Sequence, residues 1–247
     1  MKYFLDQEFI EGFHKPWFGK RRHFIDLISI GIVAEDGREY YAINSEYDYF
    51  KADDWVIQNV IRPIYAQEVT DAVRSKYEFC TFEQTEFLHV SNFHRYVGKP
   101  VKQIAKEIIE FMNPCIGVYM TQEGMAEYRK VHNVKDFTDP AIDFPLVRDE
   151  WAQPELYGYF SDYDWVLFCS LFGRMIELPK GFPMYCRDLK QTLDERAERN
   201  AKLFGGTVND ALAEIKRHVA YPKGQNEHNA LADARFNRDL YNFLQKL

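Results

Sequence analysis

Residues 2–10, KYFLDQEFI, raise the first question about this sequence. Their aromatic and β-branched side chains are typical of a half-buried β-strand. Asp6 and Glu8 lie two residues apart, so on a strand both carboxylates point to the same face. Two like charges side by side cost free energy unless a shared proton or a cation neutralises them. The stretch therefore predicts a first strand that presents a cation-binding pair.

The composition is that of an ordinary globular protein. The chain has 247 residues, of which 46% are hydrophobic and 28% are charged, enough for one large domain or two small ones with a buried core. The net charge of −7 argues against a non-specific electrostatic binder of nucleic acid. It does not exclude an enzyme whose acidic centre holds metal ions that bind phosphate.

The cysteines and the N-terminus indicate the cellular compartment. Cys80, Cys115, Cys169 and Cys186 never form a C-x-x-C motif, so we expect reduced thiols rather than a zinc site or a disulfide framework. The sequence begins with a strand that carries Asp6 and Glu8, not with a signal peptide, and no apolar run reaches membrane-spanning length. We therefore expect a cytoplasmic protein.

The N-terminal third predicts an antiparallel meander. Residues 11–24 contain Gly, Pro and several basic residues and predict a loop. Residues 24–48, FIDLISIGIVAEDGREYYAINSEYD, predict a hairpin with a strand to Ala34, a turn at Asp36-Gly37 and a return strand to about Glu46.

The rest of the chain predicts helices and two further strands. We expect a short helix that stops near Pro63 and an amphipathic helix over residues 99–114. Further along we expect strands at 155–161 and 183–189, and helices over 162–175, 192–204, 207–219 and 229–247. This order predicts an α/β fold, with a mixed sheet whose antiparallel meander continues into parallel strands flanked by helices. We expect one domain over residues 1–247, with an insertion within about 63–153.

Two further acidic motifs could share the cation. Asp162 and Asp164 lie where a strand ends and a helix begins, so each could cap the helix or bind a metal. His228 precedes Asp233 by five residues. If Asn229 is the N-cap of the last helix, His228 lies in the preceding loop and Asp233 faces the sheet, as a general base beside a metal ligand requires.

Together these motifs give four carboxylates: Asp6, Glu8, Asp164 and Asp233. Their charge matches two divalent cations, and two such ions about 4 Å apart can stabilise both the entering and the leaving oxygen of a phosphodiester displacement. Oxygen-only ligands favour Mg²⁺ or Mn²⁺ over zinc.

The three motifs resemble those of the DEDDh exonucleases, which are two-metal 3′–5′ exonucleases on a ribonuclease H-like fold. The stretches YFLDQEFIE (3–11), ELYGYFSDYDWVLFCSLFG (155–173) and HNALADAR (228–235) are similar to the small mycobacterial-type exoribonuclease subfamily. The resemblance covers roughly residues 1–62 and 155–247. It implies a metal-dependent 3′–5′ exoribonuclease that releases nucleoside 5′-monophosphates.

The resemblance also implies roles for individual residues. The four carboxylates would be metal ligands, with Asp162 as the alternative to Asp164, and His228 would take the proton from the attacking water. Phe9 and Ile10 would contact the terminal nucleotide. The basic side chains that could hold the RNA backbone are Lys15, Lys20, Arg21, Arg22, His23 and Arg187. Their alternatives are a solvated surface loop and, for Arg187, a salt bridge such as one to Asp188.

Several alternatives stay open at this point. No single residue distinguishes ribose from deoxyribose, so only the resemblance favours an RNA 3′ end over DNA. A proofreading-type DNA exonuclease and an inactive relative that only binds nucleic acid are the competing functions. Relatives are often dimers, which favours a homodimer, and nothing in the sequence indicates a membrane partner.

Overall fold

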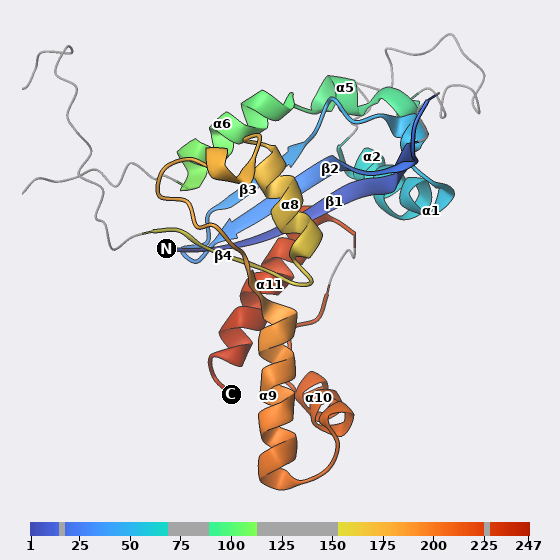
Figure 1. The fold of residues 1–247 in the computed structure, drawn as a ribbon. Helices are drawn as coiled ribbons and strands as arrows, with labels where there is room; N and C mark the ends of the chain where they lie inside the picture. The colour runs from blue at the N-terminus through green and yellow to red at the C-terminus, as the bar shows by residue number, and fades with distance from the viewer. Residues whose placement is uncertain (15–17, 69–88, 113–152, 225–227) are drawn as a thin grey trace, which may run out of the picture.

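A five-stranded mixed sheet forms the centre of the computed structural model, which describes residues 1–14, 18–68, 89–112, 153–224 and 228–247 (Figure 1). The strand order is β3-β2-β1-β4-β5. The antiparallel strands are β1 (Lys2–His14), β2 (Arg22–Ala34) and β3 (Glu39–Ile43). The parallel strands β4 (Glu155–Gly158) and β5 (Arg187–Asp188) continue from β1. The predicted α/β class with its mixed sheet is confirmed.

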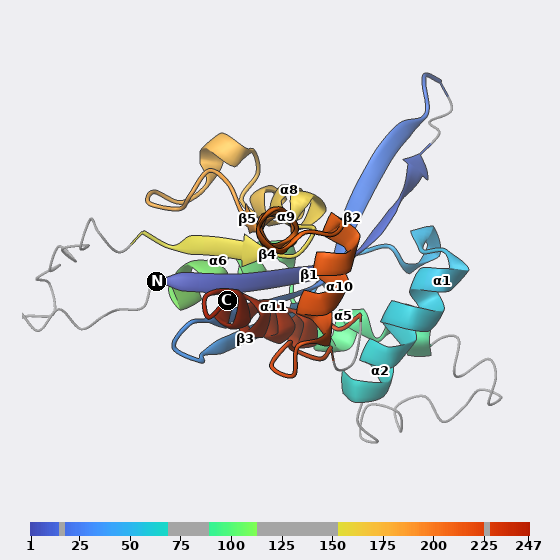
Figure 2. The same cartoon turned by 90° about the horizontal axis from the view of Figure 1, so that it is seen from below.

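The hairpin of β1 and β2 is longer than the sequence predicted. Residues 11–14 and 22–24, predicted as loop, continue the ladder from the pair Glu11 and Ile25 to the pair His14 and Arg22. Their cross-strand pairing outweighs the loop-like composition. The register shifts between Glu8 and Phe9, where β2 holds one extra residue. Beyond this bulge the hairpin projects past the helices (Figure 2).

Alternate side chains of β1 pack against helices on opposite faces of the sheet. Tyr3 and Leu5 join a core with α6 (Val101–Met112) and α8 (Asp162–Ser170). Phe4 joins a core with α9 (Leu189–Phe204) and α11 (Ala230–Leu244). The helix α10 (Val208–Arg217) packs beside α9, and both extend away from the sheet at the bottom of Figure 1. Residues 3–5 of β1 are therefore buried on both faces of the sheet, which is why this stretch is continuously apolar.

A third core lies at the end of the sheet near the hairpin. Here Ile10 and Ile28 pack against Val60, Ile61 and other residues of a helical segment. That segment consists of a 3-10 turn (Tyr49–Lys51), α1 (Asp54–Val56), a π-helical stretch (Ile57–Ile61) and α2 (Arg62–Glu68), and α5 (His94–Val97) lies beside it.

Pro63 does not end this helical segment, contrary to the prediction. It lies in the first turn of α2, directly after the π-helical stretch. Proline lacks an N–H and its ring clashes with the carbonyl four residues earlier, and a wider π turn relieves both constraints.

The C-terminal helices follow the prediction closely. Thr207 is the N-cap of α10, and its hydroxyl accepts a hydrogen bond from the Asp210 N–H.

β3 ends at Ile43, three residues earlier than predicted. A 3-10 turn (Met175–Glu177) follows α8. The greater part of the predicted insertion, residues 69–88 and 113–152, lies outside the described residues. No helix in the described part of the chain is long and apolar enough to cross a membrane.

Gly31 of β2 allows the start of α11 to lie directly on the sheet. A Cβ placed at Gly31 would come within 2.3 Å of the Ala230 carbonyl oxygen and 2.4 Å of the Leu231 nitrogen. Both contacts are to backbone atoms, which cannot rotate away. Because Gly31 pairs with Asp6 of β1, this contact fixes the N-terminus of α11 beside the acidic pair.

Replacing Gly31 with alanine should therefore destabilise the protein. Overpacking of this kind costs about 1–3 kcal/mol, so we expect a lower melting temperature and a lower denaturant midpoint. Gly12→Ala is the matched control on β1, because the added Cβ there meets only the ring of Phe24, at 3.0 Å. Equal stability of Gly31→Ala and Gly12→Ala would show that α11 is not held at this distance from the sheet.

Candidate active site

Three carboxylates from two elements converge at the outer edge of β1. β4 pairs only with residues 2–4 of β1, so no strand of the described residues covers the edge beyond Phe4. Asp6 and Glu8 lie on this part of the strand, and Asp233 lies in the first turn of α11. One carboxylate oxygen from each lies within 4.8 Å of the other two. The sequence motifs at the two ends of the chain thus meet in one cluster.

Asp164 faces the same cluster from α8, whereas Asp162 is exposed. The side chain of Asp164 is only 6% exposed, and the backbone N–H of Gln7 stabilises the charged form of this carboxylate. Its Oδ1 atom is buried and has no hydrogen-bond partner among the described residues. Ser161 is the N-cap of α8, so both aspartates lie within the first turn and neither is the cap that the sequence allowed.

Burial and neighbouring carboxylates raise the pKa values of Asp6 and Glu8, and burial raises that of Asp164. Burial, followed by the charges of Asp164, Glu8 and Asp233, raises the pKa of Asp6 well above its usual range. Burial and the charges of Asp233 and Asp164 raise the pKa of Glu8 to about 8. Burial is also the main reason why the pKa of Asp164 rises to about 7. The cluster therefore favours a bound proton or a bound cation.

The donor set of the cluster fits a hard divalent cation. All the candidate ligand atoms are carboxylate oxygens, three of them already within 4.8 Å of one another. The partnerless Oδ1 of Asp164 is a buried acceptor that a cation would satisfy. Such an oxygen-only set suits Mg²⁺ or Mn²⁺.

His228 lies beside Asp233, in the position expected if Asn229 caps the last helix. Asn229 is the N-cap of α11, and its Oδ1 accepts a hydrogen bond of 3.0 Å from the Ala232 N–H. The backbone N–H of His228 donates a bond of 3.1 Å to Oδ2 of Asp233. Its ring lies edge-to-face against Trp55 of α1, with 4.9 Å between the ring centroids. Trp55 is a contact that the sequence analysis did not identify.

Two non-glycine residues in the described part of the chain have a positive φ, and both precede a helix that carries a cluster carboxylate. Phe160 has a φ of 55° and lies four residues before Asp164. His228 has a φ of 66° and lies five residues before Asp233. Such backbone conformations are strained for residues with a side chain and concentrate at functional sites.

Asn237 fixes α11 to β1 one turn after Asp233. Its side chain is 1% exposed, and its Nδ2 donates a hydrogen bond of 2.9 Å to the carbonyl oxygen of Leu5, the residue before Asp6. The sequence analysis missed this residue. A signal was present, because Asn237 is a polar residue on the apolar face formed by Ala230, Ala234 and Leu240.

The predicted substrate contacts on the β1–β2 hairpin lie in three different environments. Phe9 is partly buried, and its ring lies 5.7 Å from that of Tyr163. Lys20, Arg21 and Arg22 are exposed on the far part of the hairpin. The side chain of Ile10 is 0% exposed and packs in the third core, so it belongs to the interior rather than to the surface over the cluster.

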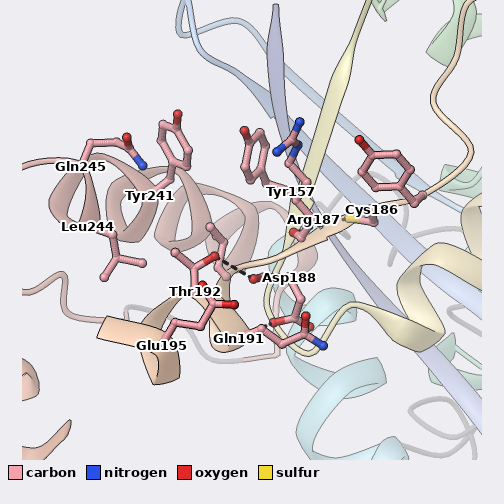
Figure 3. A pocket seen from close by; sticks show the side chains of 12 residues that line it. Tyr157, Cys186, Arg187, Asp188, Gln191, Thr192, Glu195, Tyr241, Leu244 and Gln245 are labelled. Carbon is pink, nitrogen blue, oxygen red and sulfur yellow. Dashed lines mark hydrogen bonds between the residues drawn. The ribbon is translucent and has the colours of Figure 1, made fainter. Parts of the chain in front are cut away.

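Arg187 lies in a separate hollow of about 550 Å³ between β5, α9 and the end of α11 (Figure 3). None of the four carboxylates lines this hollow. The guanidinium is 3.4 Å from Glu155 and lies 5.8 Å from the centroid of the Tyr157 ring. Its ion pair is thus with Glu155 and not with Asp188, whose carboxylate instead accepts bonds from the N–H groups of Lys190, Gln191 and Ser161.

The chain is similar to known proteins that carry an exoribonuclease name. Proteins named 3′-5′ exoribonuclease from two strains of Mycobacterium tuberculosis, CDC 1551 and H37Rv, are each 28% identical to this chain over 216 residues. The match covers 87% of this chain and 88% of each relative. No protein-family model matches the chain.

Replacing Asn237 with alanine should disturb the cluster without removing any of its carboxylates. The buried Leu5 carbonyl would lose its partner, which costs about 1–3 kcal/mol. We expect a lower melting temperature and weaker Mn²⁺ binding measured by calorimetry. Asn242→Ala is the control, because Asn242 is exposed on the same helix. Unchanged Mn²⁺ affinity in Asn237→Ala would show that Asp233 does not depend on this bond.

Proposed function

We propose that this protein is a metal-dependent 3′–5′ exoribonuclease that hydrolyses the terminal phosphodiester of RNA to nucleoside 5′-monophosphates. The observation that carries the proposal is the cluster of Asp6, Glu8 and Asp233 oxygens within 4.8 Å, with the buried Asp164 facing it. The exoribonuclease names of the two relatives support the reaction and the choice of RNA.

The four carboxylates would hold two Mg²⁺ or Mn²⁺ ions. When bound, such a pair of ions supplies positive charge that stabilises the entering and departing oxygens of a phosphodiester displacement. The carboxylates come from β1, α8 and α11, so the folded sheet and both helices are needed to assemble the site. Without ions, burial and then the charges of the neighbouring carboxylates raise the pKa of Asp6.

His228 is the proposed general base. It would accept a proton from the water that attacks the terminal phosphorus, while the bond from phosphorus to the 3′-oxygen breaks and the 3′-oxygen takes up a proton from solvent. Its backbone bond to Asp233 and its ring contact with Trp55 hold it next to the cluster. Phe9, which directly follows Glu8, would contact the terminal nucleotide.

The exonuclease proposal predicts a defined degradation pattern. Purified protein with Mg²⁺ or Mn²⁺ should shorten a 5′-labelled RNA from its 3′ end, and EDTA should abolish the reaction. Asp6→Asn and Asp164→Asn should each reduce the rate by at least a hundredfold, because each removes a proposed ligand. Asp162→Asn is the matched control on α8 and should retain activity, because Asp162 is exposed. The measurement is a time course on a denaturing gel, with DNA of the same sequence in parallel.

The outcomes distinguish the alternatives. Degradation of DNA but not of RNA would agree with the proposed catalytic site and would overturn the proposal that RNA is the substrate. Binding of Mn²⁺ without cleavage of either substrate would contradict the proposed catalysis and favour a binding protein. Equal loss of activity in Asp162→Asn and Asp164→Asn would contradict the assignment of Asp164.

His228→Ala should separate catalysis from metal binding. Loss of a general base slows proton transfer by about 10²–10⁴-fold. The rise in melting temperature on addition of Mn²⁺ should remain, because the carboxylates are retained. The measurement pairs single-turnover RNA cleavage with thermal unfolding at several Mn²⁺ concentrations. A variant that cleaves at the wild-type rate would exclude His228 as the base.

A further inference from the structure

Four aromatic rings form a connected row on one side of the β1–β2 hairpin. We call Phe9, Tyr163, His23 and Phe13 the ring row. The centroid distances are 5.7 Å between Phe9 and Tyr163, 6.1 Å between Tyr163 and His23, and 5.5 Å between His23 and Phe13. Phe13 is 55% exposed and Tyr163 is 45% exposed, so solvent reaches the rings.

The ring row begins beside two cluster carboxylates in the sequence and runs outward, on the face of β1 opposite to Asp6 and Glu8. Phe9 directly follows Glu8, and Tyr163 directly precedes Asp164. Phe9 and Phe13 are four residues apart on β1 and point to the same face, and His23 is the cross-strand partner of Phe13. The row therefore follows the part of the hairpin that projects beyond the helices (Figure 2).

Positive charge is concentrated at the outer end of the ring row. The Arg21 guanidinium lies 4.0 Å from the centroid of the Phe13 ring. Lys20, Arg21 and Arg22 are exposed, and none has an ion-pair partner among the described residues. The opposing charge is Glu11, whose carboxylate is 3.5 Å from His23. In a chain of net charge −7, this local excess of cations is suited to a polyanion.

We propose that the ring row is a stacking platform for single-stranded RNA, occupied by the unpaired nucleotides on the 5′ side of the terminal one. The inference rests on the proposed exonuclease function, which places the 3′ terminus at the carboxylates. Exposed rings beside a basic stretch are the two features with which proteins bind single strands, the rings stacking on bases and the cations contacting phosphates. Bases in a duplex are not available for such stacking, so the platform selects RNA with an unpaired 3′ tail.

The first test measures binding separately from cleavage. The affinity of a 5′-fluorescein RNA of about ten unpaired nucleotides is measured by anisotropy, with Asp6→Asn in every protein to prevent hydrolysis. Adding Phe13→Ala or Tyr163→Ala should weaken binding by roughly fivefold or more per ring. Tyr163→Phe should restore the affinity, because it keeps the ring. Phe204→Ala, at the end of α9 and 83% exposed, is the control ring and should have no effect.

The second test measures hydrolysis against substrate length. Phe13→Ala should raise KM for the long RNA and leave hydrolysis of a dinucleotide unchanged, because a dinucleotide ends before the outer rings. If the wild-type protein hydrolyses neither substrate, the proposed function fails, and the anisotropy still decides whether the ring row binds RNA. If the alanine variants bind the long RNA as tightly as the parent protein, the ring row is only intramolecular packing and the inference is overturned.

A third measurement requires no aromatic substitution and so does not depend on the variants folding. A 2-aminopurine base is placed at successive positions of the RNA and bound to Asp6→Asn. Stacking on the ring row should change its fluorescence at positions near the 3′ end and not at a distant 5′ position. A base at the 3′-proximal positions that behaves as it does in free RNA would overturn the inference.

Discussion

Electrostatic repulsion among carboxylates is the constraint on which the rest of the structure depends. Asp6, Glu8, Asp164 and Asp233 come from three elements, and burial adds to the free energy needed to keep them charged. The surrounding fold has to supply that free energy. The long apolar strand β1, which packs on both faces, and the helices α8 and α11 provide it through hydrophobic burial. A bound cation would offset the repulsion among the carboxylates. The hydrophobic burial would then remain as a net stabilisation of the folded state.

Two contacts between α11 and the sheet hold Asp233 in a fixed position. Gly31 allows the backbone of α11 to touch β2, and Asn237 bonds to the carbonyl before Asp6. One contact requires the absence of a side chain and the other requires a particular polar one. Between them, the first two turns of α11 are held against the strands that carry the acidic pair. His228 has a left-handed backbone conformation, and its own N–H bonds to Asp233 in the same cluster.

The sequence predicted local features well and distant contacts poorly. The mixed sheet, the caps at Thr207 and Asn229 and the amphipathic helix α6 follow from patterns within a few residues. The spacing of Asp6 and Glu8 likewise identified half of the acidic cluster. In contrast, the contacts of Asn237 with Leu5 and of His228 with Trp55 join residues far apart in the chain. The burial of Ile10 and the extension of the hairpin to His14 were missed because tertiary packing and strand pairing outweigh local composition.

The bulge between Glu8 and Phe9 separates two parts of one hairpin. Before it, the pairing of Asp6 with Gly31 ties the acidic pair to the core, and a one-residue slip would turn both carboxylates to the opposite face. After it, the extra residue in β2 gives the outer hairpin its own register. The outer hairpin can therefore change in length, by whole pairs of residues, while the carboxylates stay where they are. In such a hairpin, the exposed outer surface can diverge between related proteins without any shift of the carboxylates at its base.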